Sequence, residues 1–196
     1  MLTKFQNRFE LLPENAYLAK QVHGTHALRV HASDSQAMIA GTEADALWTT
    51  DADVLLAVKT ADCGPVLLWH KDGQCAVAIH AGWKGVVANI VGKTLSEVRR
   101  ETGLSMADFH AQIGPCLSFD RFEIGPEVAS QVSEKFLKSG VGDRSYLDLK
   151  GLIRSQLEEA GVVNIEVSEN CTLSEPKSYF SNRRGDLGRQ YSLVSL

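Results

Sequence analysis

The 196-residue sequence lacks several features that would assign it to a specialised class of protein. It has no excess of basic residues, because 20 Lys and Arg stand against 24 Asp and Glu and the net charge is −4. This balance excludes a broad electrostatic grip on nucleic acid or on an anionic membrane surface. No stretch is apolar for long enough to cross a bilayer, and the start has no signal-peptide pattern. We therefore expect a cytoplasmic protein with no nucleic-acid and no membrane partner.

Cysteine is scarce and scattered. The four cysteines lie at positions 63, 75, 116 and 171 and include no CxxC pair, which argues against a zinc finger and against a disulfide framework. In a reducing compartment they are expected to be free thiols, thiolate ligands or nucleophiles. Repeats, low-complexity tracts and Pro/Ser-rich linkers are also missing. Because the length suits one hydrophobic core, we predict a single domain over residues 1–196.

The apolar residues that are present follow both strand and helix periods. A strand-like apolar run covers 53–63, and two more, 65–70 and 74–80, flank Lys71-Asp72-Gly73, a strong hairpin signal. Helical periods predict helices over 83–103, from Pro126 through Phe136, and over 148–159, and strands over 163–169 and after the basic loop that ends at Arg189. Because strands and helices do not alternate strictly, we predict an α+β fold of layered mixed β-sheets flanked by helices.

The predicted hairpin brings Cys63 and His80 together. A two-residue loop at Asp72-Gly73 pairs residues whose numbers sum to 145, so Pro65 faces His80. Cys63 and His80 then lie diagonally on one face with Cα atoms roughly 7–8 Å apart, close enough to share a zinc ion. A three-residue loop would put them on opposite faces. By the same count His70 opposes Cys75 beside the turn, where we expect a structural or solvent-edge pair.

A catalytic zinc site needs a third protein ligand beside an open position. The spacing of the sequence leaves this ligand open and prefers His23 only slightly, because Gly24 lets the backbone turn there. The other candidates are His26, His31, His110, Cys116 and Cys171.

Five motifs carry a resemblance that covers residues 17–190. QVHG, TADCGPVLL, HAGWKG, IGPC and YFSNRRGDLGRQ occur in this order along the chain. In order and approximate spacing they resemble the laccase-domain-containing or YfiH-like family, whose members have been named multicopper polyphenol oxidase and purine nucleoside phosphorylase. The combination of TADC with HAGW is highly specific.

The resemblance implies a site and an activity. It implies that His23, Cys63 and His80 bind one zinc ion, with Cys63 and His80 as the catalytic residues beside the central sheet. The implied reaction is phosphorolysis of adenosine, inosine and methylthioadenosine by phosphate, together with deamination of adenosine. Copper is the alternative metal, since a His₂Cys set suits a blue-copper site. Six histidines with no His-x-His pair are too few for a trinuclear copper cluster, which excludes true multicopper oxidation.

The chain also departs from the family pattern. The family's usual N-terminal segment, with its Thr-Arg and Gly-Gly motif, is expected to be missing. The usual HAGWRG is HAGWKG here, so Lys84 replaces a bidentate arginine with a point charge. Ser118-Phe119 and Asp120 stand where the family has a second Gly-Pro and often a cysteine. These changes bear on substrate preference more than on the metal site.

Phosphate needs cations and free N–H groups close to the metal. Ala81-Gly82-Trp83 is expected to open a helix directly after His80, and its free N–H groups can hold an anion. The cations expected to bind substrate or phosphate are Lys84, Arg183, Arg184 and Arg189. Trp83 could stack on a base or pack in the core.

Deamination further requires a carboxylate that moves protons. Asp62 points away from Cys63 if the strand is regular, so it is either a supporting or a strand-end residue, and Glu43 and Asp45 are alternatives that the sequence does not separate.

Two other functions fit the same residues. A cysteine-type amidase editing cell-wall precursors would use Cys63 as nucleophile and His80 as base without a metal. A zinc-stabilised, non-enzymatic binding protein would close the site with Cys116 or Cys171 as a fourth ligand. The sequence does not indicate the oligomeric state.

Overall fold

A computed structural model describes residues 2–5, 13 and 15–196 of the chain, so residues 1, 6–12 and 14 of the predicted domain lie outside it. The described helices are α1 (Gln36–Gly41), α2 (Trp83–Val87), α3 (Ile90–Thr102), α4 (Pro126–Ala129) and α5 (Leu149–Ala160). The strands are β1 (Leu2–Phe5), β2 (Ala16–Tyr17), β3 (Ala27–Arg29), β4 (Ala46–Thr49), β5 (Leu55–Thr60), β6 (Gly64–His70), β7 (Ala76–Ala81), β8 (Phe109–Ile113), β9 (Glu123–Ile124), β10 (Leu137–Ser139), β11 (Ser145–Leu147), β12 (Asn164–Val167) and β13 (Gln190–Ser195).

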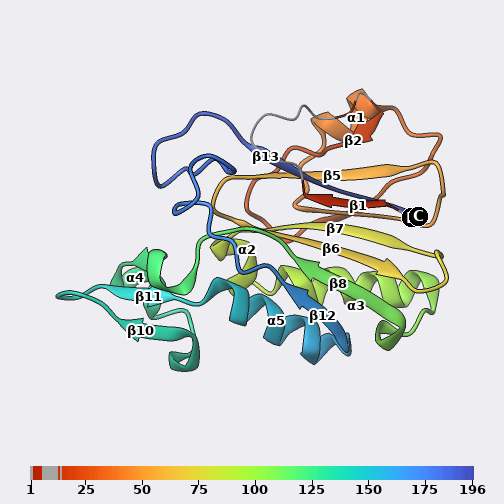
Figure 1. The fold of residues 1–196 in the computed structure, drawn as a ribbon. Coiled ribbons are helices and arrows are strands. Elements are labelled where there is room, and N and C mark those ends of the chain that lie inside the picture. The colour runs from red at the N-terminus through yellow and green to blue at the C-terminus, as the bar shows by residue number, and fades with distance from the viewer. Residues whose placement is uncertain (1, 6–12, 14) are drawn as a thin grey trace.

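Three layers make up the main body (Figure 1). A six-stranded mixed sheet, ordered β12-β8-β6-β7-β4-β3, forms the middle layer, and helices α3 and α5 lie below it. A four-stranded sheet, ordered β1-β13-β5-β2, lies above it, and a small sheet of β10, β11 and β9 projects from one end. The predicted α+β class with layered mixed sheets and flanking helices is confirmed.

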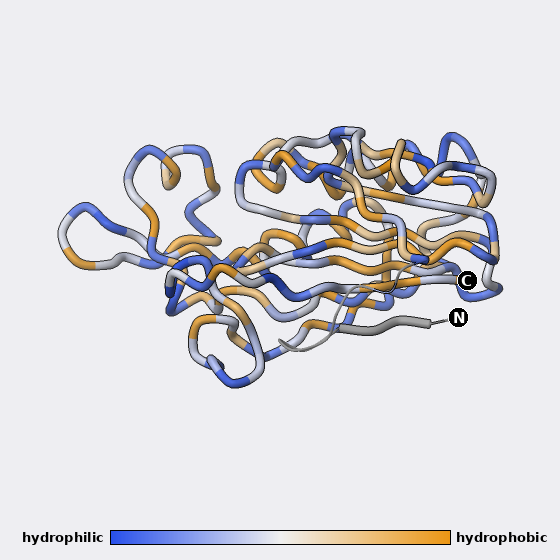
Figure 2. The backbone as a smooth tube through the Cα atoms, turned by 90° about the horizontal axis from the view of Figure 1, so that it is seen from above, coloured by the Kyte–Doolittle hydropathy of each residue, from blue (hydrophilic) through white to orange (hydrophobic). Residues whose placement is uncertain are grey.

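The apolar runs at 65–70 and 76–81 are continuous because these strands are buried on both faces. Alternate residues of β6 and β7 point to opposite sides. Val66 and Val77 pack toward α3 and α5, whereas Leu67 and Ala78 pack toward the four-stranded sheet. Figure 2 shows the hydrophobic residues concentrated along the strands and helices of the body, with hydrophilic residues on the outlying loops.

The central hairpin keeps the predicted register but not the predicted loop. Pro65 pairs with His80 and Leu68 with Val77, so paired numbers sum to 145 as expected. The loop is four residues, 71–74, because the His70 N–H still donates to the Cys75 carbonyl at 2.9 Å. Two- and four-residue loops share one register, so this error leaves every side chain on its predicted face.

Two predicted helices are wrong in extent. The helix expected over 83–103 is divided into α2 and α3 by Asn89, whose φ of 62° is left-handed and whose side chain caps α3 by accepting the Gly92 N–H. The helix expected from Pro126 stops after Ala129, and a short 3₁₀ turn follows over Glu134–Phe136. The third predicted helix is confirmed as α5, which Asp148 caps at its start and Gly161 ends.

In the part of the chain that the structure describes, no helix combines the length and apolar character needed to cross a membrane.

Candidate metal centre and substrate pocket

Three side chains from distant parts of the sequence meet where the central hairpin opens. One ligand atom from each of His23, Cys63 and His80 lies within 4.8 Å of the others, and the Cys63 Sγ is 3.7 Å from the His23 Nε2. The two imidazole rings meet edge to face, with centroids 4.8 Å apart. Among the described residues this is the one such group of His, Cys and acidic side chains. The structure therefore brings together all three residues that the sequence suggested as metal ligands.

The local backbone explains how each ligand reaches the centre. His80 lies in β7 and is 3% exposed, whereas Cys63 comes one residue before β6 and is partly exposed. His23 lies in a loop and takes a left-handed conformation with φ 61°, so the turn expected at Gly24 falls on the histidine itself. Gly82 leaves room for the group, since a Cβ there would lie 2.7 Å from the His23 Cδ2.

Asp45 supports two of these ligands at once. Its carboxylate is 1% exposed and lies 2.8 Å from the His80 Nδ1, which leaves the His80 Nε2 to face the centre. The same carboxylate accepts the backbone N–H groups of Val22, His23 and Gly24 at 2.7–3.2 Å. A carboxylate behind a histidine ligand fixes the tautomer and orients the ring. Asp45 thus orients His80 and holds the loop that carries His23.

Glu43, the acid that the sequence did not separate from Asp45, lies in a different environment. It pairs with Lys20 at 2.8 Å on the surface, where both side chains are 60% exposed. The structure therefore separates two carboxylates that the sequence left equivalent: only Asp45 reaches the centre.

The electrostatics of the group favour a thiolate. Burial opposes ionisation of Cys63, but hydrogen bonds with His23 and His80 outweigh it and lower the pKa of the thiol to about 7. Burial also opposes protonation of His80, but hydrogen bonds with Asp45 and Cys63 raise its pKa to about 9. At neutral pH the metal-free centre therefore holds a protonated His80, while Cys63 is divided between thiol and thiolate because its pKa is about 7.

The donor set of the centre fits zinc. Two imidazoles and one thiolate are ligand types that zinc prefers in proteins. A buried carboxylate that contacts one of the imidazoles is also typical of zinc sites. Neither Cys116 nor Cys171 belongs to the group. Burial raises the pKa of Cys116 to about 12, so its thiol stays protonated. All four cysteines are free thiols, and Cys75 and His70 are buried near the hairpin turn, the latter edge-on to Phe109.

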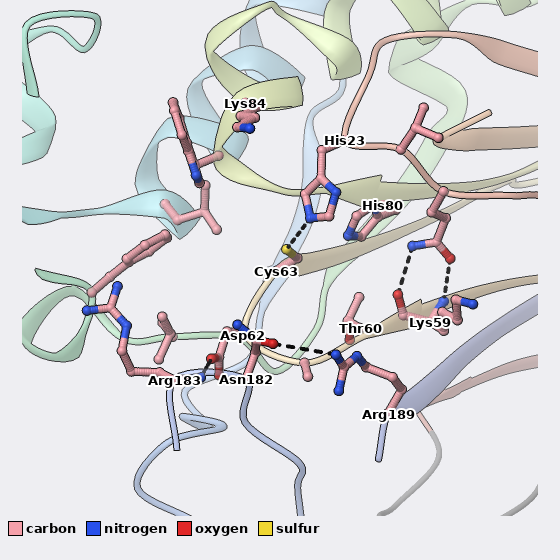
Figure 3. A pocket seen from close by; sticks show the side chains of 17 residues that line it. His23, Lys59, Thr60, Asp62, Cys63, His80, Lys84, Asn182, Arg183 and Arg189 are labelled. Carbon is pink, nitrogen blue, oxygen red and sulfur yellow. Dashed lines mark hydrogen bonds between the residues drawn. The ribbon is translucent and has the colours of Figure 1, made fainter. Parts of the chain in front are cut away.

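The centre opens into a pocket of about 480 Å³. Its apolar lining residues include Trp83, Leu117, Phe122 and Leu149. Cationic side chains are spread among the lining residues, and Figure 3 shows Lys84, Arg183 and Arg189 at different places around the pocket. Its polar and charged residues, apart from the centre itself, are Gln21, Lys59, Thr60, Asp62, Lys84, Asn182, Arg183 and Arg189.

Three of the four predicted cations line this pocket. Lys84 lies with its Nζ 5.7 Å from the Trp83 ring, and the Arg183 guanidinium donates to the Glu123 carbonyl at 2.9 Å. Arg189 donates to the Asn182 Oδ1 and to nearby carbonyls. Arg184 does not line the pocket, because its guanidinium is directed to the carbonyls of residues 172, 173 and 179 and to Asp186.

Sequence reasoning missed Lys59, Gln21 and Asn182. The Gln21 side chain bonds both the N–H and the carbonyl of Lys59, at 2.9 and 2.8 Å, and so joins the loop of His23 to β5. Two of the three stand within or next to the motifs QVHG and SNRRG, and that adjacency was the available signal.

The predicted start of a helix at Gly82 is confirmed. This helix, α2, has only five residues, so its dipole is small.

Comparison with known proteins places the chain in a family. The family model described as multi-copper polyphenol oxidoreductase laccase matches residues 2–196. The chain belongs to this family. A purine nucleoside phosphorylase of Deinococcus radiodurans is 36% identical over 185 residues, which cover 90% of this chain and 68% of that protein. Purine nucleoside phosphorylase YfiH of Escherichia coli is 31% identical over 193 residues, covering 94% and 75%.

Solved structures support the same assignment. YlmD from Geobacillus stearothermophilus superposes with a TM-score of 0.86 at 29% identity, over 93% of this chain and 73% of that one. The Bacillus licheniformis protein YfiH gives a TM-score of 0.87, also at 29% identity, over 93% and 74%. The relatives' names support an enzyme of the purine nucleoside phosphorylase kind.

Proposed function

We propose that the protein is a zinc-dependent purine nucleoside phosphorylase that also deaminates adenosine. One observation carries the proposal: a His₂Cys group, braced by a buried carboxylate, opens into a pocket lined by both aromatic and cationic side chains. The metal ligands are His23, Cys63 and His80. Zinc, when bound, would supply a Lewis acid that polarises an oxygen of the reactants. Copper would bind the same donors.

Different residues of the pocket are expected to bind the purine and the phosphate. Trp83 and Phe122, two aromatic lining residues, offer ring faces on which a purine can stack. Lys84, Arg183 and Arg189 supply positive charge that holds phosphate close to the sugar. A phosphate oxygen forms the bond to the anomeric carbon as the bond from that carbon to the purine nitrogen breaks. The purine leaves with the electron pair and takes up a proton.

Deamination replaces the amino group at C6 of adenine with oxygen from water, and ammonia leaves. Asp45 lies behind the lining residues with both carboxylate oxygens engaged, and Asp62 is the one carboxylate among the described lining residues. Both oxygens of Asp62 already accept hydrogen bonds. We therefore expect deamination to be slower than phosphorolysis.

A cysteine-type amidase acting on cell-wall precursors is the second candidate, favoured by the Cys63 pKa of about 7. In this reaction the Cys63 thiolate attacks an amide carbonyl, and a neighbouring histidine protonates the amine that leaves. The Cys63 Sγ lies 3.7 Å from the His23 Nε2, so His23 is a candidate for this role beside the predicted base His80.

One assay separates the candidates. Zinc-loaded protein is incubated with adenosine, inosine or methylthioadenosine and phosphate, and the products are resolved by chromatography. Free base with sugar 1-phosphate supports phosphorolysis, and inosine formed from adenosine supports deamination. Neither product, together with cleavage of a muramoyl-amide precursor that survives removal of zinc by a chelator, would reject the phosphorylase in favour of the amidase.

A further inference from the structure

Asp62 occupies an unusual position directly before the ligand Cys63. Its φ of 84° is left-handed, which is uncommon for a residue other than glycine, and its side chain is buried in the pocket wall. In Figure 3 it lies next to Asn182 and Arg183, on the side of Cys63 away from His23. The turned backbone directs the Cys63 side chain to the metal centre and the Asp62 side chain to the C-terminal loop.

The carboxylate is satisfied entirely by that C-terminal part of the chain. One oxygen accepts the Thr172 hydroxyl at 2.7 Å, and the other accepts the Ser181 hydroxyl at 3.1 Å and the Arg183 N–H at 2.6 Å. The Asp62 carbonyl also accepts the Leu117 N–H at 3.2 Å. Asp62 therefore joins its own segment to residue 117 and to the C-terminal stretch that contains residues 172 and 181–183.

The loop that it holds carries charge into the pocket. The Ser181 hydroxyl, which donates to Asp62, also accepts the Arg184 N–H at 3.2 Å. The Arg183 guanidinium reaches the Glu123 carbonyl and lies 5.8 Å from the Phe122 ring centroid. The Arg183 side chain is thus aimed from a main chain whose anchor is Asp62.

We propose that Asp62 is a positioning residue that fixes the Arg183 main chain, and with it the Arg183 guanidinium, at a set distance from Cys63. The proposal rests on the proposed function for its effect on phosphate. Hydrogen bonds to a charged acceptor are strong, and a displacement of about 1 Å at a reacting centre costs up to 100-fold in rate. With both oxygens occupied, Asp62 acts through geometry and not by moving a proton.

Three substitutions test this role. Asp62→Gly removes both acceptors and suits the positive φ, so it adds no backbone strain. Asp62→Asn keeps the shape and removes the charge: its amide oxygen can accept from Ser181 and Arg183, while its NH₂ donates to the Thr172 hydroxyl. Thr172→Val removes one contact at nearly constant volume. Asp143→Asn is the control, because Asp143 is an exposed acid beside Arg144.

The first measurement is amide exchange of the Arg183 N–H, which needs no activity. In Asp62→Gly its protection falls by about tenfold or more, since the acceptor is gone. Thr172→Val gives a smaller fall, and Asp62→Asn and Asp143→Asn keep the protection. Unchanged protection in both Asp62→Gly and Thr172→Val would overturn the proposal.

The second measurement is phosphorolysis by zinc-loaded protein. Asp62→Gly raises KM for phosphate by about tenfold and changes KM for the nucleoside little. Asp62→Asn restores most of the activity. An Asn variant as inactive as the Gly variant, with zinc content and Arg183 protection intact, would overturn a positioning role, since only the charge or the proton would then matter. If wild type has no phosphorolysis, the proposed function fails, while the exchange result still decides whether Asp62 holds the loop.

Discussion

Two buried acids, Asp45 and Asp62, hold different parts of the candidate site. Asp45 accepts N–H groups of the His23 loop and contacts the His80 ring, so it positions two of the proposed metal ligands. Asp62 accepts the Thr172 and Ser181 hydroxyls and the Arg183 N–H, so it holds the main chain of Arg183. Because the two networks share no side chain, we expect that metal affinity and phosphate affinity can be changed separately.

Cys63 is the point where the two regions meet, and its removal has the largest expected effect. In Cys63→Ala the centre loses its thiolate, so stoichiometric zinc and phosphorolysis are both lost. Metal analysis after gel filtration measures the zinc. The matched control is Cys75→Ala, which removes a buried thiol near the hairpin turn and should keep the metal. Stoichiometric zinc in Cys63→Ala would refute the ligand assignment.

Substitution of Asp45 should break the metal side of the comparison alone. Asp45→Ala frees the His80 ring and the His23 loop, and we expect zinc affinity to fall by about 10–100-fold. Titration with a competing chelator at pH 9 measures it, because proton competition at His80 is small there. Asp62→Gly should change zinc affinity little. An equal loss in the two variants would show that the two networks are not separate, and Asp45→Asn serves if the alanine variant does not fold.

The pH dependence of zinc binding sharpens the comparison further. Zinc takes a thiolate and an unprotonated imidazole nitrogen, whereas the pKa of His80 is raised to about 9. Between pH 7 and 9 binding must displace the His80 proton, so affinity should rise by about tenfold per pH unit and level off above 9. Below pH 7 the Cys63 proton adds to the slope, since the pKa of that thiol is about 7. Affinity that is constant from pH 7 to 9 would contradict a protonated His80.

A smaller effect is expected at Gly82, where the centre has no spare room. A Cβ would lie 2.7 Å from the His23 Cδ2 and 3.1 Å from the Cys63 Sγ, so Gly82→Ala must push His23 aside. We expect a cost of about 1 kcal/mol in zinc binding, or about fivefold in affinity. Gly41→Ala is the control, since its Cβ would meet no atom within 4 Å. Equal zinc affinity in both variants would show that His23 is free to move.

Much of the fold was predictable because its signals are local. Continuous apolar runs indicated β6 and β7, Asp148 and Gly161 marked the ends of α5, and the hairpin register followed from Asp72-Gly73. The break at Asn89 was not predictable, because the apolar period of the helix runs through it. The early end of α4 was missed for the same reason, since a period does not record where tertiary contacts stop a helix.

The candidate site was predictable to a lesser degree. Hairpin arithmetic brought Cys63 to His80, but spacing alone hardly preferred His23 to the other candidates, because no local rule joins a loop to a strand 40 residues away. Arg183 and Arg184 are neighbours in sequence with the same side chain. Only the direction that the folded loop gives each one sends the first to the pocket and the second to backbone carbonyls.

The sequence by itself determined the α+β class, the hairpin register and the family motifs, since each depends on residue type and spacing along a short stretch. The tertiary structure decided which acid supports the ligands, which arginine faces the pocket and what Asp62 holds. Those outcomes depend on hydrogen bonds between segments up to 121 residues apart, and such contacts exist only once the layers have packed.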